Sequence, residues 1–161
     1  MLEGVDLVYD ATAEVGIQHL LADLAIERSI PYLCISTTPG AWGGLVARIR
    51  PQHTEGCWIC LQNALTDGTI PSPPFDPAGG VQPKGCADPT FTGAGFDVGQ
   101  VALAGVRLAV ATLSAGTNGG YPDVGWDVVV VSLRDPDRRM IAPQWETFSL
   151  ARHPSCSCGK R

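Results

Sequence analysis

Four cysteines stand in two close pairs that lie far apart in the chain. Cys57 and Cys60 form a C-x-x-C pair in EGCWICLQNA, and Cys156 and Cys158 form a C-x-C pair in HPSCSCGKR. Four thiolates suit tetrahedral zinc, with Zn–S bonds of about 2.3 Å. The pairs therefore predict a zinc ion that holds the C-terminal tail against the first pair. Two disulfides, or an unstructured tail, are the alternatives.

The other two cysteines differ in their surroundings. Cys34 lies within the apolar stretch IPYLCIS, where a buried thiol behaves as a small hydrophobic side chain. Cys86 follows Pro83-Lys84-Gly85 at the end of a long loop and precedes an expected helix start. A thiol beside a lysine and a helix N-terminus can have a lowered pKa and act as a nucleophile. An ordinary half-exposed thiol is the alternative for Cys86.

Composition limits the classes of function. The chain has 161 residues, 45% of them apolar and 17% charged, which fits one globular domain. Its net charge is −5 and its 11 basic residues are scattered, so we expect no nucleic-acid partner. We find no secretory signal, and the apolar run 98–113 is broken by Gly99, Gln100, Gly105 and Arg107. We therefore expect a cytoplasmic protein with reduced thiols and no membrane partner.

Strands and helices alternate in the first part of the chain. A short apolar strand at 5–9 is followed by an amphipathic helix at 14–28 and a second apolar strand at 30–36. This is a βαβ unit, which is built on a parallel sheet and indicates the α/β class. The segment 43–49 alternates apolar and polar residues, as an edge or half-buried strand does.

The remaining elements follow from composition and turn residues. Segment 65–84 is rich in Pro, Gly and Asp and predicts a long surface loop. A strongly apolar helix is expected at 97–113, with Asp97 near its N-terminus, followed by a loop at 114–123. Segments 126–133 and 140–150 flank a Pro-Asp turn and predict a β-hairpin.

Taken together, these stretches resemble the second half of the ThiF/MoeB/HesA proteins, the prokaryotic relatives of ubiquitin-activating enzymes. The shared order is DLVYDAT, a helix, a strand ending near STTPGAWG, the C-x-x-C pair, a loop, the apolar helix, the hairpin and RHPSCSCG. The resemblance covers nearly the whole chain, and the paired cysteines with RHP before the second pair are its most specific part. The block GCADPTFTGAGFD is similar to bacterial branches of the family.

The resemblance implies a partial Rossmann-like fold and an adenylating activity. Family members bind ATP with Mg²⁺ and adenylate the C-terminal glycine carboxylate of a ubiquitin-like or sulfur-carrier protein. Some then form a thioester on a loop cysteine, the position that Cys86 matches here. Asp10, in the family's D-x-T-D motif, is the residue assigned to the cofactor. The resemblance also implies a homodimer, to which the apolar helix at 97–113 can contribute a surface.

Two departures from the family pattern affect the expected activity. Ala13 replaces the last Asp of the D-x-T-D motif. Glu14 is the next residue, but successive side chains on a helix point about 100° apart, so Glu14 is not expected to take the place of that Asp. No G-x-G-x-x-G follows a strand, so residues 1–161 are expected to be a C-terminal portion without the N-terminal ATP-binding half. Such a chain alone should not turn over ATP. A non-catalytic zinc-stabilised scaffold is the alternative, and a redox or secreted disulfide protein is a third interpretation.

Overall fold

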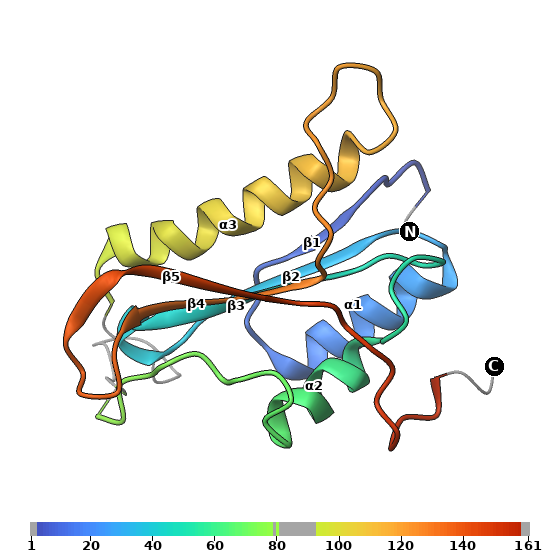
Figure 1. Ribbon diagram of the computed structural model, residues 1–161. Coiled ribbons are helices and arrows are strands. Elements are labelled where there is room, and N and C mark those ends of the chain that lie inside the picture. The colour runs from blue at the N-terminus through green and yellow to red at the C-terminus, as the bar shows by residue number, and fades with distance from the viewer. Residues whose placement is uncertain (1–2, 79, 81–92, 159–161) are drawn as a thin grey trace, which may run out of the picture.

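The computed structural model describes residues 3–78, 80 and 93–158. One five-stranded sheet forms the centre, with strands in the order β1-β2-β3-β4-β5. Helix α3 lies on one side of the sheet, and α1 and α2 lie on the other (Figure 1). The elements are β1 (Val8–Asp10), α1 (Val15–Glu27), β2 (Tyr32–Thr37), the 3₁₀ turn η1 (Pro39–Ala41), β3 (Gly43–Ile49), α2 (Trp58–Thr66), α3 (Gly95–Leu113), β4 (Val128–Arg134) and β5 (Met140–Phe148).

The βαβ unit expected from the sequence is present. β1 pairs with β2 in parallel, and α1 connects them. β1 is shorter than expected and begins at Val8, where its backbone N–H reaches the carbonyl of Pro31. The Glu14 side chain caps α1 by accepting a hydrogen bond from the backbone N–H of Ile17 at 2.7 Å.

The rest of the sheet is antiparallel, so the sheet is mixed rather than parallel. β2 pairs with β3, β3 with β4, and β4 with β5, all in antiparallel register. The β4–β5 pair confirms the predicted hairpin. The sequence correctly placed β3 at 43–49, but the expectation that it is an edge or half-buried strand is wrong. β3 lies at the centre of the sheet, and all seven of its residues are buried.

Both faces of the sheet are covered, and β4 shows this most clearly. Val128 and Val130 pack in the cluster with α1 and α2, whereas Val129 and Val131 pack in the cluster with α3. A strand buried on both faces needs a continuous apolar run rather than an alternating one. The run 128–131 supplies it, because successive side chains point to opposite faces.

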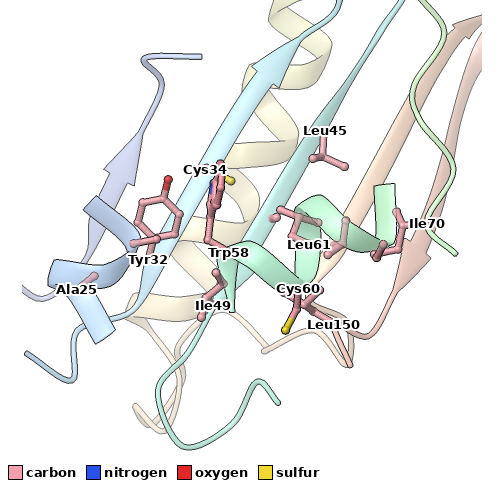
Figure 2. Packing of buried hydrophobic residues seen from close by; sticks show 14 of the residues in the cluster. Ala25, Tyr32, Cys34, Leu45, Ile49, Trp58, Cys60, Leu61, Ile70 and Leu150 are labelled. Carbon is pink, nitrogen blue, oxygen red and sulfur yellow. The ribbon is translucent and has the colours of Figure 1, made fainter. Parts of the chain in front are cut away.

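Helix α2 was not predicted from the sequence. It occupies part of the segment between β3 and the loop, and its first turn carries the second cysteine of the C-x-x-C pair. Trp58, Leu61 and Ala64 are buried against the sheet, at the 3–4 residue spacing of a helix face. Figure 2 shows Trp58 and Leu61 within this core and Cys60 at its edge beside Leu150.

Helix α3 has two apolar faces. One face packs on the sheet through the fully buried residues Val101, Ala104, Leu108 and Ala111. The other exposes a stripe of large apolar side chains at heptad-like spacing: Phe96, Leu103, Val106, Val110 and Leu113, which are 45–72% exposed. By length and composition, with a mean hydropathy of 1.4, α3 is long and apolar enough to cross a membrane. The helix is longer than the apolar run 98–113, and one of its faces covers the sheet as a core helix does.

Packing of α3 on the sheet gives a first testable prediction. Leu108→Ala should destabilise the protein by about 2–5 kcal/mol, because it removes a fully buried side chain and leaves a cavity. Leu20→Ala, on the exposed side of α1, is the matched control and should change stability by less than about 0.5 kcal/mol. Urea denaturation followed by circular dichroism measures both. Equal, small effects would mean that α3 does not pack as described.

Candidate metal centre and its surroundings

The two cysteine pairs meet at one point. Cys57 precedes the first residue of α2, Cys60 lies in its first turn, and Cys156 and Cys158 follow β5 in the tail. The Sγ atoms of Cys57 and Cys156 are 3.6 Å apart, as are those of Cys60 and Cys158. All four Sγ atoms lie within 4.8 Å of one another. The convergence predicted from the sequence is confirmed. We call these four residues the cysteine tetrad.

The spacing of the tetrad fits a metal ion. A tetrahedron with metal–sulfur bonds of about 2.3 Å has sulfur–sulfur edges of about 3.8 Å. The Cys57–Cys60 distance is 3.8 Å, and the two distances between the pairs are 3.6 Å. A disulfide would need about 2.05 Å, and the tetrad cysteines are all free. The tetrad can therefore hold one metal ion.

Three thiols of the tetrad differ in acidity. Burial raises the pKa of Cys57, and also that of Cys158. Burial alone would also raise the pKa of Cys60. Hydrogen bonds outweigh this effect and lower the pKa of Cys60 to about 7; they involve the backbone of Cys57 and His153 and the thiols of the tail. Cys60 thus ionises more readily than Cys57 and Cys158. A bound cation favours the thiolate form of every ligand.

His153 fastens the tail to the end of α2. Its Nδ1 accepts a hydrogen bond from the backbone N–H of Ser155, so its Nε2 carries the proton and donates to Asp67 Oδ2 at 2.9 Å. This hydrogen bond holds the pKa of Asp67 at about 2. The carbonyl of His153 also accepts from the Cys156 N–H. His153 therefore positions the C-x-C pair, and within the described residues the ligand cluster consists of cysteines only.

Asp10 lies at the carboxyl end of β1 and is 1% exposed. Its Oδ1 accepts hydrogen bonds from the Thr12 backbone N–H at 2.9 Å and from the Thr12 hydroxyl at 2.7 Å. Its Oδ2 accepts from the Tyr32 hydroxyl at 2.9 Å. The carboxylate thus orients the turn that follows β1. Glu14 is engaged in capping α1, so its carboxylate does not replace the one missing at Ala13.

A buried arginine forms a network that the sequence did not reveal. Arg48 on β3 is 0% exposed, and its guanidinium donates to Thr112, to Asp123 Oδ1 at 2.7 Å, and to the carbonyls of Val124 and Trp126. Arg50 donates to Asp123 Oδ2. Arg48 thereby joins β3 to α3 and to the loop before β4. The only sequence signal was a charged residue in an otherwise apolar strand.

The structure tests the prediction for one of the two remaining cysteines. Cys34 is 4% exposed, and burial raises its pKa to about 12, which confirms its assignment to the core. Cys86, the predicted nucleophile, lies outside the described residues, and its role stays a prediction.

Comparisons with known proteins connect this chain to two proteins of Sinorhizobium fredii (strain NBRC 101917 / NGR234), both of uncharacterized function. It is 35% identical to y4oA over 159 residues and 38% identical to y4qC over 168 residues. These alignments cover 99% and 98% of the chain but only 26% and 27% of the relatives. The chain thus spans about a quarter of the length of each relative. No family model matches it.

Solved structures show which fold this is. The microcin C7 biosynthetic enzyme MccB in complex with N-formylated MccA matches with a TM-score of 0.54 at 12% identity, over 97% of this chain and 42% of that chain. E. coli MccB with ATP matches with a TM-score of 0.52 at 14% identity, over 97% and 40%. A heterocyclase in complex with substrate and cofactor reaches 0.57 at 13% identity, over 96% and 20%. The chain has the mixed α/β fold of part of these enzymes.

Proposed function

We propose that this chain is a portion of an ATP-dependent adenylating enzyme that activates the C-terminal carboxylate of a peptide, ubiquitin-like or sulfur-carrier protein. The observation that carries the proposal is the fold, which matches part of MccB over nearly the whole chain. MccB has been solved with ATP and with N-formylated MccA. The resemblance of the cysteine pairs and of the motif at Asp10 to the ThiF/MoeB/HesA pattern gives separate support.

The proposed reaction has two steps. A carboxylate oxygen of the substrate attacks the α-phosphorus of ATP and releases pyrophosphate, which leaves an acyl-adenylate. In the second step, a thiolate attacks the acyl carbon and AMP leaves, which gives a thioester. We assign this thiolate to Cys86. Asp10 holds the turn at the carboxyl end of β1, the place where open α/β sheets bind ligands, and Mg²⁺ would accompany ATP there.

The tetrad has a structural role in this proposal. We assign zinc as its metal, because four thiolates in tetrahedral spacing are the common ligand set of structural zinc. Such a closed site leaves no position for substrate, so its contribution is to fasten the tail to α2. The chain's own residues around it, His153 and Asp67, keep the C-x-C pair in place.

ATP–pyrophosphate exchange tests the activity. The complete open reading frame, mixed with a candidate carrier protein, should incorporate labelled pyrophosphate into ATP, and a carrier with an amidated C-terminus should not support exchange. The isolated chain of 161 residues should show no exchange. Lack of both exchange and nucleotide binding by the complete protein would favour a scaffold without catalysis. Ala13 and the engagement of Glu14 in capping are the observations that favour this second candidate.

Reactivity of Cys86 can be compared directly with that of Cys34. Cys86 should be alkylated by iodoacetamide faster than Cys34, because Cys34 is 4% exposed with its pKa raised to about 12. Peptide mapping by mass spectrometry over a time course measures both rates in one sample. If Cys34 reacts first, Cys86 is not an activated thiol.

We assign the exposed stripe of α3 to a homodimer interface. A stripe at heptad-like spacing suits pairing with a second apolar helix, because it buries side chains that water otherwise surrounds. Leu103→Asp should therefore shift a dimer to a monomer in sedimentation velocity. Met140→Asp, at an exposed apolar residue on β5, should leave the dimer intact. A wild-type chain that is monomeric at high concentration would contradict this assignment.

A further inference from the structure

A cavity of about 440 Å³ lies directly beside the cysteine tetrad. Its walls come from three segments that are distant in the sequence: the outer part of α1, the loop from β3 to α2, and the tail at 155–158. This volume falls within the range of about 300–1,000 Å³ that is usual for sites that bind small ligands. The tetrad role proposed above does not use the cavity.

The cavity combines an apolar lining with carboxylates. Ile26, Ile49 and Ile59 contribute apolar surface, and Asp23 and Glu55 contribute carboxylates. In the part of the chain that the structure describes, Asp23 has one ionic contact, 3.4 Å from His19 Nε2, and Glu55 has none. The lining therefore suits a ligand with an apolar stem and a polar end.

The net charge around the cavity is negative. Arg50 is the basic residue of the lining, but its guanidinium is engaged by Asp123 at 2.6 Å and by Asp127 at 3.9 Å. Three of the four tetrad cysteines line the cavity, and a tetrathiolate site stays negative after a divalent ion binds. With Asp23 and Glu55, these groups attract a cation. This part of the argument rests on the metal loading proposed above.

One wall also offers a flat ring. His19 stacks on the buried Trp58, with ring centroids 5.1 Å apart and an interplanar angle of 11°. This stacking fixes the orientation of the imidazole at the cavity. A planar guanidinium can stack on such a ring and can also donate two parallel hydrogen bonds to a carboxylate, which an ammonium group cannot do.

We propose that this cavity binds the side chain of an arginine on a partner polypeptide. The three methylene groups of arginine would lie against the isoleucines, and the guanidinium would reach Asp23 and Glu55 beside His19. A polypeptide partner fits the cavity because it is an open depression large enough for one long side chain. This makes the neighbourhood of the tetrad a recognition surface in addition to a structural one.

Titration with short peptides tests the proposal. The probes are acetyl-Gly-Arg-Gly-amide, the same peptide with lysine, and the same peptide with citrulline, a neutral isostere of arginine. Two-dimensional ¹H–¹⁵N NMR on the zinc-loaded chain should show shifts of amides in α1, the β3–α2 loop and the tail. The arginine peptide should bind roughly ten-fold more tightly than the citrulline peptide, and more tightly than the lysine peptide.

Variants separate this site from general electrostatic attraction. Asp23→Asn combined with Glu55→Gln should weaken arginine binding roughly five-fold or more, because both carboxylate partners are lost. Glu146→Gln, which removes one negative charge on the exposed edge strand β5, should leave binding unchanged. Zinc content is measured on the same sample, so a missing metal is detected separately from missing peptide binding.

Three results would overturn the proposal: equal binding of the citrulline or lysine peptide, shifts confined to other surfaces, or equal binding by the Asp23/Glu55 double variant.

Discussion

Cys60→Ser should release the metal from the tetrad and free the C-terminal tail. The wild-type chain should carry about one zinc ion, and the variant close to none, because the tetrahedral set loses a ligand that is buried in the core. Structural zinc sites in small peptides have apparent binding free energies of about 10–16 kcal/mol, so the effect should be large. Metal analysis after gentle purification measures it.

The expected structural consequence is local. The sheet has its own core on both faces, whereas the tail is held by the tetrad, by His153 and by Leu150. Trypsin should therefore cut after Arg152 faster in Cys60→Ser than in the wild type, and a strong chelator should have the same effect on the wild type. Cys34→Ala is the matched control, because Cys34 is a buried cysteine outside the tetrad. The Cys34→Ala variant should keep its zinc. Zinc-free wild-type protein would contradict the metal assignment.

Arg48→Met should be the most destabilising change outside the tetrad. Arg48 is fully buried, and its removal leaves the Val124 and Trp126 carbonyls without this donor and Asp123 with Arg50 and the Val124 backbone N–H as its remaining donors. Because Asp123 is 36% exposed, the main cost comes from the two carbonyls left without a donor, at about 1–3 kcal/mol for each unsatisfied buried acceptor. Urea denaturation measures the loss. Arg139→Met, at a side chain that is 75% exposed, should change stability by less than about 0.5 kcal/mol.

The same network predicts a dependence on pH. Partial burial would raise the pKa of Asp123, but hydrogen bonds and charge from Arg48 and Arg50 outweigh it and hold the pKa below its usual value. The contribution of Asp123 to stability is therefore complete above its unfolded-state pKa of about 3.9, and it is lost as the pH falls through the lower folded-state value. Asp123→Asn should remove this acid-sensitive contribution to the free energy of unfolding. An unchanged acid transition in that variant would exclude Asp123 as its source.

The local pattern of the sequence was sufficient for several elements. Helix α1 and strands β2 and β3 lie close to their predicted ranges, because periodic apolar residues and a capping residue act over a few positions. The hairpin of β4 and β5 followed from a Pro-Asp turn between two expected strands. The meeting of the two cysteine pairs was predicted from ligand chemistry, since four close thiols in two pairs suit one tetrahedral ion.

Long-range contacts decided the rest. Helix α2 is nine residues long and depends on the packing of Trp58 and Leu61, which no local pattern specifies. Strand β3 alternates as an edge strand would, but it is central, because it pairs with β2 on one side and with β4 on the other. Its charged residue, Arg48, finds partners on α3 and in the loop before β4.

By itself, the sequence thus determined the α/β class, most elements and the candidate metal ligands. Only the tertiary structure decided the mixed sheet, the burial of Arg48, the engagement of Asp10 by Thr12 and Tyr32, and the cavity beside the tetrad. The physical reason is that secondary-structure propensity depends on residues close together in the sequence. The metal ligands could be predicted because thiolates have a known affinity for zinc. Burial and charge pairing depend on which distant segments the fold brings together.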